Sequence, residues 1–285
     1  MEIILAEHYG LCFGVRDALK AAEASAAAGP VTILGELVHN PLALERLANH
    51  GAHRGSLDDL GSARSHSVLI TAHGAADERR TAWKSAGFRV VDTTCPLVKR
   101  AHRQLAGLVA GGYFPVVIGQ RDHVEVRGLT GDFPGAAVVA SEEDFAALPT
   151  HERRLGVISQ TTQPAEKVTR LVAALRAARP DAEVCFCDTV CQPTKDRQNA
   201  LRTLTERAEV VIVVGGRHSN NTRQLVLSVQ AAGRRAHQVE RAEDLDPAWI
   251  AGAQTVGLTA GTSTLPDTVR AVHARLQDLA AAWQR

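Results

Sequence analysis

The sequence repeats one strand–cysteine–helix pattern three times, and this repeat limits what the chain can fold into. An apolar, strand-forming run ends shortly before a cysteine in "EIILAEHYGLC", "FRVVDTTC" and "AEVCFCDTVC". A segment with helical spacing of its apolar residues follows each cysteine. The next strand ends in a polar loop, 27, 28 and 28 residues after the cysteine: His39 after Cys12, His123 after Cys95 and Ser219 after Cys191. Repeats of this length indicate that one structural unit occurs three times.

The alternation of strands and helices predicts an α/β protein with mainly parallel sheets. The strand-forming runs are "EIIL", "VTIL", "SVLIT", "FRVVD", "PVVIG", "RLGVIS", "EVVIVVG" and "TVGLT". We expect three small α/β domains around a pseudo-threefold axis, which would bring the three cysteines to one point. The expected domains are 13–95, 96–190 and 191–280, with the strand in 1–12 and the tail 281–285 packed at the centre or on the third domain.

Composition and charge argue against several classes of function. The chain has 285 residues, of which 45% are apolar and 22% charged, and its net charge is near +1. It has no strongly basic segment of the kind that binds nucleic acid. It also has no apolar run of about 18 residues, and its first apolar run is too short for a signal peptide. We therefore expect a cytoplasmic protein with no nucleic-acid or membrane partner.

The cysteines at the strand ends indicate a metal centre. Cys185 and Cys187 alternate within a strand and are expected to face one way, into a core. Cys12, Cys95 and Cys191 instead stand beside Gly, Pro or Thr where strands end. Zinc sites usually draw on close cysteine pairs, and a cysteine protease needs only one thiol. Three thiolates suit an iron–sulfur cluster with one iron open to a substrate oxygen.

Polar loops after the strands predict a site for phosphate oxygens. They supply hydrogen-bonding side chains without Lys or Arg, together with strand-to-helix amides. The side chains are those of His39, His73, His123, Ser219, Asn220, Asn221, Thr262 and Ser263. Glu125 is the one carboxylate in these loops and follows His123 by two residues, on the same side of an expected extended segment. A dry site would raise the pKa of Glu125, so it is the candidate proton donor.

Nine motifs follow one another along the chain: "GLCFGV", "LVHNP", "TAHGA", "DTTCPLV", "DHVEV", "SQTT", "CQPTKDRQ", "VVGGRHSNNT" and "LTAGTST". With these motifs in the expected order, the chain resembles the LytB/IspH family of 4-hydroxy-3-methylbut-2-enyl diphosphate reductases over nearly its full length. The resemblance implies a trefoil of three small α/β domains around a central [4Fe-4S] cluster. It also implies the last step of the non-mevalonate isoprenoid pathway, in which an allylic alcohol diphosphate loses its hydroxyl group to two electrons and protons.

The resemblance also assigns roles to individual residues. The cluster ligands would be Cys12, Cys95 and Cys191. Glu125 would deliver the proton, Thr161 would orient the substrate hydroxyl, and His123 would serve both catalysis and diphosphate binding. The remaining substrate-binding residues would be His39, His73, Thr194, Ser219, Asn220, Asn221 and Ser263. A ferredoxin or flavodoxin would supply electrons, because no flavin or nicotinamide motif is visible in the sequence.

The sequence departs from the family pattern in the diphosphate loops. The family usually has Asn-Ser-Ser-Asn where this chain has 218–221, "HSNN", and Gly-Ala-Ser-x-Pro where it has "GTSTLP" at 261–266. It commonly has Gly-His-Pro-Glu where this chain has "DHVE" at 122–125. Two alternatives therefore stay open. One is a paralogue that performs reductive dehydration of a different substrate, and the other is a non-catalytic iron–sulfur sensor.

Overall fold

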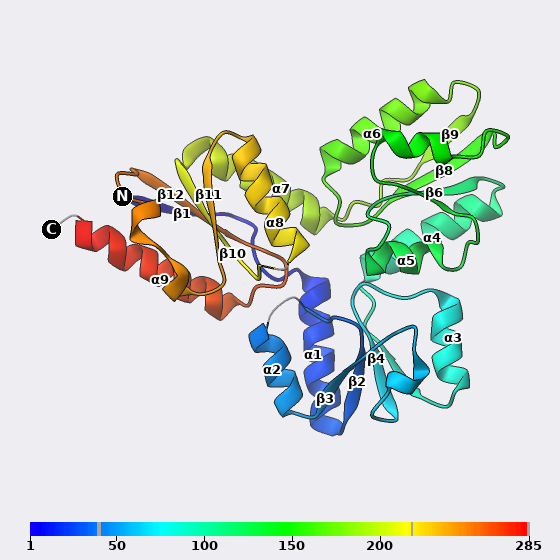
Figure 1. Ribbon diagram of the computed structural model, residues 1–285, viewed down its shortest axis with the longest axis horizontal. Helices are drawn as coiled ribbons and strands as arrows, with labels where there is room; N and C mark the ends of the chain where they lie inside the picture. Colours follow the sequence, from blue (N-terminus) through cyan, green and yellow to red (C-terminus); the bar gives the residue numbers. More distant parts are fainter. Residues whose placement is uncertain (39–40, 218, 284–285) are drawn as a thin grey trace. The chain divides into compact units, whose positions relative to one another are not determined.

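A computed structural model describes residues 1–38, 41–217 and 219–283 of the chain. In this part of the chain the strands form three four-stranded sheets, and every strand pair is parallel (Figure 1). The β2 sheet has the order β3(Ala52–Gly55), β2(Val31–Leu34), β4(Ser67–Ile70), β5(Arg89–Asp92). The β6 sheet has the order β7(Ala137–Val139), β6(Phe114–Ile118), β8(Arg154–Ser159), β9(Glu183–Phe186). The β10 sheet has the order β11(Arg235–Val239), β10(Val210–Val214), β12(Thr255–Ala260), β1(Glu2–Leu5).

Helices connect the strands, as parallel pairing requires. They are α1(Phe13–Ala28), α2(Pro41–Asn49), α3(Asp77–Ser85), α4(Pro96–Ala110), α5(Val124–Thr130), α6(Ala165–Ala178), α7(Gln192–Arg207), α8(Asn220–Ala231) and α9(Pro266–Trp283). None of the helices that the structure describes is both long and apolar enough to cross a membrane. The prediction of an α/β protein with three parallel-sheet units is confirmed.

The three sheets repeat one strand order. In each of them the strand that precedes a cysteine lies at one edge: β5 before Cys95, β9 before Cys191 and β1 before Cys12. The β10 sheet obtains this strand from the other end of the chain, because β1 pairs with β12 from Glu2 opposite Thr255 to Leu5 opposite Leu258. The opposite edges are β3, β7 and β11, which the sequence analysis did not predict as strands.

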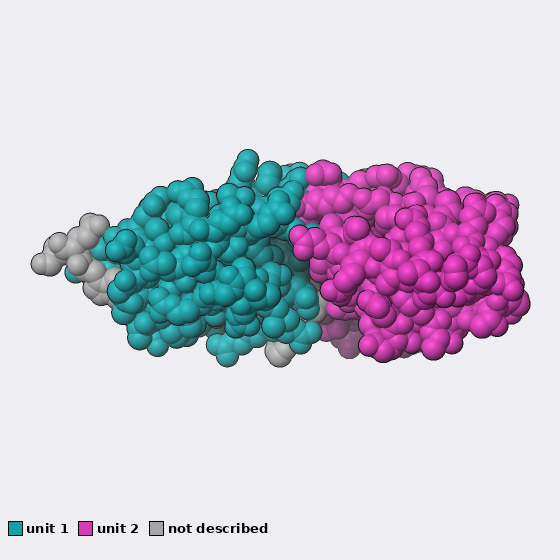
Figure 2. Space-filling model, turned by 90° about the horizontal axis from the view of Figure 1, so that it is seen from above, with its two compact units in different colours: residues 1–16, 38–49, 196–285 teal, residues 17–37, 50–195 magenta. Residues whose placement is uncertain are grey.

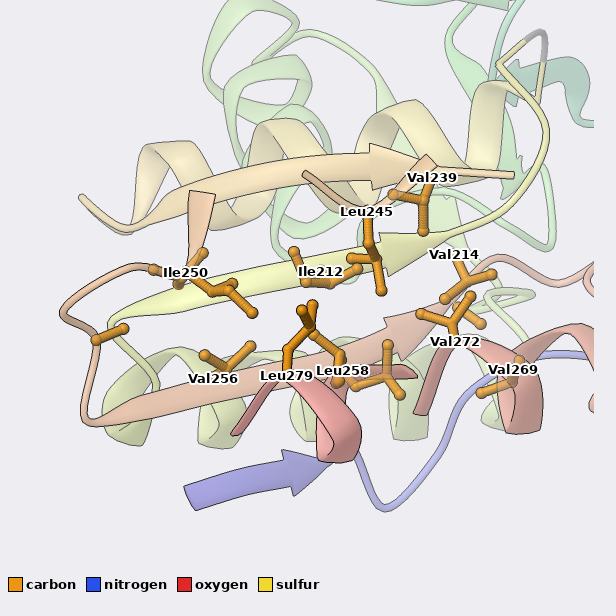
Figure 3. Close-up of a cluster of buried hydrophobic side chains, with 14 residues drawn as sticks. Ile212, Val214, Val239, Leu245, Ile250, Val256, Leu258, Val269, Val272 and Leu279 are labelled. Atoms are coloured by element: carbon orange, nitrogen blue, oxygen red, sulfur yellow. The ribbon is translucent and has the colours of Figure 1, made fainter. Parts of the chain in front are cut away.

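Each sheet is stabilised by apolar side chains that its central strands and covering helices contribute. In the β10 sheet, all five residues of β10 are buried. Ile212 and Leu258 lie on the face that α9 covers, where they form a cluster with Val272 and Leu279 (Figure 3). Burial on both faces explains why β10 reads as a continuous apolar run instead of an alternating one.

By its internal contacts the chain divides into two compact units (Figure 2). Unit 1 comprises 1–16, 38–49 and 196–285 and contains the β10 sheet. Unit 2 comprises 17–37 and 50–195 and contains the β2 and β6 sheets. The expected domains 13–95, 96–190 and 191–280 stay a prediction, as does the trefoil around a cluster.

Candidate active site

The strand order determines where a ligand site can form in each sheet. In the β2 sheet the chain runs from β2 outward to β3 and then crosses back to β4, so β2 and β4 are neighbours whose connections leave in opposite directions. Such a switch point opens a crevice at the carboxyl ends of the two strands. The described candidate residues follow the strands at these switch points: His73 follows β4, His123 follows β6, Thr161 follows β8, Ser219 follows β10 and Ser263 follows β12. His39 lies outside the described residues.

Glu125 and Thr161 meet in the interior of unit 2. Glu125 is only 1% exposed and Thr161 only 3%. The backbone N–H of Thr161 donates to Oε1 of Glu125 at 2.6 Å, and the Thr161 hydroxyl donates to Oε2 at 3.0 Å. Both carboxyl oxygens therefore have a donor, and the carboxyl group is held at the carboxyl end of the switch point between β6 and β8.

This environment suits Glu125 to proton transfer. Burial raises the pKa of the carboxyl group from 4.5 to about 7, and the two hydrogen bonds from Thr161 oppose the rise without cancelling it. A carboxyl group that titrates near neutral pH can hold a proton and release it under the same conditions.

Glu125 lies in a helix, so the expectation of an extended segment was wrong. Helix α5 begins at Val124, and His123 is its N-cap residue. The Nδ1 atom of His123 accepts the backbone N–H of Glu125 at 3.1 Å, the role that Asn or Ser usually fills. This cap satisfies a helical N–H and starts the helix where the sequence analysis expected extended backbone.

The cap determines how His123 can act. Because Nδ1 accepts a hydrogen bond, a neutral His123 carries its proton on Nε2, which is then a donor. The ring of His73 lies edge-on to the ring of His123, with 5.5 Å between the ring centroids. The Nδ1 atom of His73 is 3.5 Å from the Thr71 hydroxyl. The structure thus brings His73, His123, Glu125 and Thr161 into one part of unit 2.

The three strand-end cysteines all occupy helix starts. The carbonyl oxygens of Cys12, Cys95 and Cys191 each accept the N–H of the residue four positions later, at 2.9, 3.0 and 3.1 Å. All three thiols are half-buried and none is in a disulfide. Hydrogen bonds from such helix amides can reach sulfur ligands. Cys185 and Cys187, by contrast, pack against the same apolar cluster of the β6 sheet, as expected.

The donor set of these cysteines fits an iron–sulfur cluster. In the described part of the chain, no three His, Cys, Asp or Glu side chains are grouped to hold a single metal ion. A cluster differs from a single ion in that each of its irons binds its own thiolate, so the thiols need not converge on one atom. Cys95 and Cys191 in unit 2 and Cys12 in unit 1 are free, half-buried cysteines at helix starts, and thiolate is the ligand that such clusters take. Thr194 adds a polar neighbour, since its hydroxyl is 3.1 Å from Sγ of Cys191.

Unit 1 contains the other polar loops. Ser219 is buried and is the N-cap residue of α8, where its hydroxyl accepts the N–H of Thr222 at 3.3 Å. The carbonyl oxygen of the Asn221 side chain accepts the N–H of Thr262 at 3.0 Å, which leaves the amide nitrogen as the donor end. Ser263 is buried just beyond β12. Of Asn220 only the backbone, at the start of α8, is described.

Asp92 and Asp188 are the structural residues of the site that the sequence analysis missed. They hold the turns that lead into Cys95 and Cys191, through hydrogen bonds to Thr94 and Val190. Their signal was present in the sequence, because each stands three residues before its cysteine in "DTTC" and "DTVC".

The fold and site define a class: an α/β protein of three repeated parallel sheets, with a buried carboxyl group of near-neutral pKa and a reduced cysteine at the end of one strand of each sheet. The LytB protein family model matches residues 3–277, and the chain belongs to this family. It is 35% identical to a 4-hydroxy-3-methylbut-2-enyl diphosphate reductase of Aquifex aeolicus, over 98% of this chain and 97% of that one. It is 36% identical to a reductase of the same name from Geobacter metallireducens, over 99% of both chains.

Two solved structures share the fold. One is the E-1-hydroxy-2-methyl-but-2-enyl-4-diphosphate reductase of Plasmodium falciparum, with a TM-score of 0.86 and 27% identity over 94% of this chain and 85% of that one. The other is an (E)-4-hydroxy-3-methyl-but-2-enyl diphosphate reductase, described as the terminal enzyme of the non-mevalonate pathway. It has a TM-score of 0.72 and 34% identity over 98% of this chain and all of that one.

Proposed function

We propose that this chain reduces 4-hydroxy-3-methylbut-2-enyl diphosphate to isopentenyl and dimethylallyl diphosphates. The reaction breaks the allylic C–O bond, takes up two electrons and two protons, and releases water. The observation that carries the proposal is the buried Glu125 carboxyl group, with its pKa near 7 and both oxygens bound to Thr161. A protein that only held a cluster would gain nothing from a buried acid of this kind.

The ligands of the proposed cofactor are Cys12, Cys95 and Cys191. A [4Fe-4S] cluster held by these three thiolates would supply electrons one at a time, and its iron without a protein ligand would act as a Lewis acid toward the substrate. The Thr194 hydroxyl lies 3.1 Å from Sγ of Cys191, which supports our assignment of Thr194 to the substrate-binding residues beside this ligand. The electron donor we propose is a ferredoxin or flavodoxin.

Glu125 and Thr161 carry the proton chemistry. Glu125 holds a proton up to about pH 7 and gives it up to the substrate, and Thr161 keeps the carboxyl group in place through its N–H and hydroxyl. The Thr161 hydroxyl can rotate from Glu125 to the hydroxyl group of a bound substrate and so link the two.

The diphosphate-binding residues act as hydrogen-bond donors. Nε2 of His123, the side-chain amide of Asn221 and the hydroxyl of Ser263 are suited to phosphate oxygens, and α8 adds the amides of its first turn beside Ser219. His73, next to His123, supplies a further imidazole. We assign His39 and Asn220 to the same role from the sequence alone.

Anaerobic turnover tests the proposal directly. The protein is reconstituted with iron and sulfide and given 4-hydroxy-3-methylbut-2-enyl diphosphate, with reduced methyl viologen as the electron donor. Iron and sulfide are assayed on the same sample. We expect both five-carbon diphosphates as products. A full cluster without turnover would contradict the proposal and favour a different substrate or a sensor, and a protein that binds no iron would contradict the cluster assignment.

The Glu125→Gln variant distinguishes an enzyme from a sensor. Gln keeps the size of the side chain and an oxygen for the Thr161 N–H but has no acidic proton. Loss of general acid catalysis is expected to lower turnover by about 100-fold or more, with cluster content unchanged. Turnover equal to that of the original chain would show that Glu125 is not the proton donor.

A further inference from the structure

Two of the three cysteine turns are built to the same plan. Asp92 stands three residues before Cys95, and its Oδ1 accepts the backbone N–H of Thr94 at 2.9 Å. Asp188 stands three residues before Cys191, and its Oδ1 accepts the backbone N–H of Val190 at 3.0 Å. Each aspartate thus closes a turn over the residue next to the cysteine, as Asp side chains do in Asx turns.

A threonine attaches each turn to the neighbouring strand. The Thr93 hydroxyl donates to the carbonyl of Ile70 at the end of β4, and the Thr189 hydroxyl donates to the carbonyl of Ser159 at the end of β8, both at 2.6 Å. Two residues after each threonine, the backbone N–H of the cysteine donates a second hydrogen bond to the segment that follows the same neighbouring strand. The N–H of Cys95 donates to Ala72 at 3.0 Å, and that of Cys191 donates to Thr161 at 2.9 Å.

A lysine attaches each turn to the helix that follows. Nζ of Lys99, four residues after Cys95, is 3.6 Å from Oδ2 of Asp92. Nζ of Lys195, four residues after Cys191, is 2.5 Å from Oδ2 of Asp188. Each carboxylate therefore uses Oδ1 for the turn before the cysteine and Oδ2 for the lysine in the first turn of α4 or α7 after it, so the cysteine is held from both sides. Oδ2 of Asp92 also lies 3.4 Å from Nε of Arg80 on α3, a contact that Asp188 does not share.

The Cys12 turn has no such pair. Tyr9 and Arg16 occupy the positions of the aspartate and the lysine. Gly10 instead adopts a φ of +66°, which favours glycine, and its backbone N–H donates to Ala260 at the end of β12 at 3.0 Å. The carbonyl of Gly10 accepts the Arg197 guanidinium at 3.0 Å. Backbone contacts thus replace the side-chain pair at this cysteine.

We infer that Asp92–Lys99 and Asp188–Lys195 are positioning pairs that fix the directions of the Cys95 and Cys191 thiols toward a cluster, a role that rests on the proposed function. In this role the pairs act through the two cysteines and not on the substrate itself. The repeat unit is D-T-x-C-x-x-x-K, present twice in this chain, at 92–99 and 188–195.

The test uses Asp188, because its side chain is 47% exposed and its replacement leaves no buried charge. Asp188→Ala removes the turn hydrogen bond and the charge, whereas Asp188→Asn removes only the charge and keeps an oxygen for the N–H of Val190. Their difference therefore measures the turn alone. Asp267→Ala is the matched control, since Asp267 forms an exposed ion pair with Arg270 on α9.

The first measurement is the rate at which iodoacetamide alkylates each cysteine in the full-length, cluster-free protein, followed by peptide mass mapping. We expect Cys191 to react about fivefold faster in Asp188→Ala than in Asp188→Asn, the factor that one net hydrogen bond of ordinary strength contributes. The rates of Cys12 and Cys95 should not change. Equal Cys191 rates in the two variants, or faster reaction of all cysteines alike, would overturn the inference.

The second measurement is made on the reconstituted protein, as the rate at which a chelator removes iron and as the electron paramagnetic resonance spectrum of the reduced cluster. We expect the fastest iron loss and a changed spectrum in Asp188→Ala, a smaller change in Asp188→Asn, which loses only the ion pair with Lys195, and no change in Asp267→Ala. Unchanged loss and spectrum in Asp188→Ala would overturn the inference. Failure of the proposed function would instead appear as absent turnover in the unsubstituted protein, which neither measurement uses.

Discussion

Glu125 shows how one residue's surroundings set its chemistry. A carboxylate in water keeps a pKa near 4.5 and is ionised at neutral pH, but this one is almost fully buried and titrates near 7. The cause is desolvation, which the two Thr161 hydrogen bonds only partly offset. Proton donation at neutral pH therefore depends on the balance between burial and the number of donors at the carboxyl oxygens.

This balance predicts how Thr161 affects the pH profile. Since Glu125 acts as an acid, kcat should fall as the pH rises through about 7. Thr161→Val keeps the backbone donor but removes the hydroxyl. The hydroxyl stabilises the charged carboxylate, so its removal raises the pKa of Glu125 further. We expect a lower kcat in the variant and a midpoint of the basic limb that lies at higher pH. The measurement is anaerobic turnover from pH 6 to 9, and a midpoint that is unmoved or lower would contradict the assignment.

The same pKa predicts a pH-dependent stability. Because the pKa of Glu125 is higher in the folded than in the unfolded state, the folded protein binds this proton more tightly. The stability that the protonated group contributes is therefore fully present below about pH 4.5 and is lost as the pH rises to about 7. The loss is at most about 3 kcal/mol. Glu125→Gln removes the titration. The free energy of unfolding, measured by urea titration, should therefore increase in the variant relative to the original chain when the pH is raised from 5 to 8.

The control for this stability experiment is Glu142→Gln, a change at an exposed position near the start of a short 3-10 helix. The difference in free energy of unfolding between Glu142→Gln and the original chain should be the same at pH 5 and pH 8. A Glu125→Gln difference that stays constant with pH would mean that the buried carboxyl group does not titrate in this range.

At the scale of the elements, the central strands and the edge strands before the cysteines could be predicted from the sequence, and the opposite edge strands β3, β7 and β11 could not. The runs "VTIL" and "RLGVIS" coincide with β2 and β8, because strands buried on both faces leave long apolar signatures. The edge strands β3, "AHRG", and β11, "RAHQV", carry polar residues because one of their sides faces no partner strand. Their pairing depends on the neighbouring strand, which no local pattern reports.

The residues of the candidate site, like the strands, could be predicted from the sequence only in part. Residues that follow apolar runs, such as His73 and Thr161, could be located from the sequence, because strand ends at switch points form sites in any open α/β sheet. The helical position of Glu125 could not, because it depends on one hydrogen bond from the Glu125 N–H to the His123 ring. The part that Asp188 plays likewise depends on a contact, with Lys195, that becomes visible only after folding.

The strand ends in the β10 sheet give a prediction at this scale. Thr222, the third residue of α8, is fully buried, and its hydroxyl has no hydrogen-bond partner among the described residues. It lies against Gly261, where a Cβ atom would overlap it. Gly261→Ala should therefore lower the free energy of unfolding by about 1–3 kcal/mol, the usual cost of overpacking.

Thr222→Ala should rescue this loss, because it removes the hydroxyl that an alanine at 261 would meet. A double-mutant cycle of Gly261→Ala and Thr222→Ala, followed by thermal unfolding, measures the coupling. We expect the double variant to be more stable than Gly261→Ala alone. Additive losses would mean that the two residues do not touch.

At the scale of the whole molecule, the chain completes its third sheet with its first strand. Strand β1 pairs with β12 at four positions, Glu2 to Leu5, and its side chains pack on both sides of the β10 sheet. Ile3 and Leu5 contact the cluster that α9 covers, and Ile4 contacts the cluster on the other face. The same strand leads to Cys12, so folding of unit 1 and delivery of one thiol depend on a single pairing between distant parts of the sequence.

Deletion of residues 2–5 tests this dependence. The deletion removes the hydrogen bonds between β1 and β12, each worth about 1 kcal/mol net, and leaves β12 as an edge strand. Amide hydrogen exchange measured by mass spectrometry should therefore accelerate in β12 and β10 by at least about tenfold, a change of about 1.4 kcal/mol. Exchange in β4 and β8, which belong to unit 2, should keep its original rate. The control is Glu2→Gln, which removes only an exposed ion pair with Arg207. Unchanged exchange in β12 of the shortened chain would show that the β10 sheet does not need its first strand.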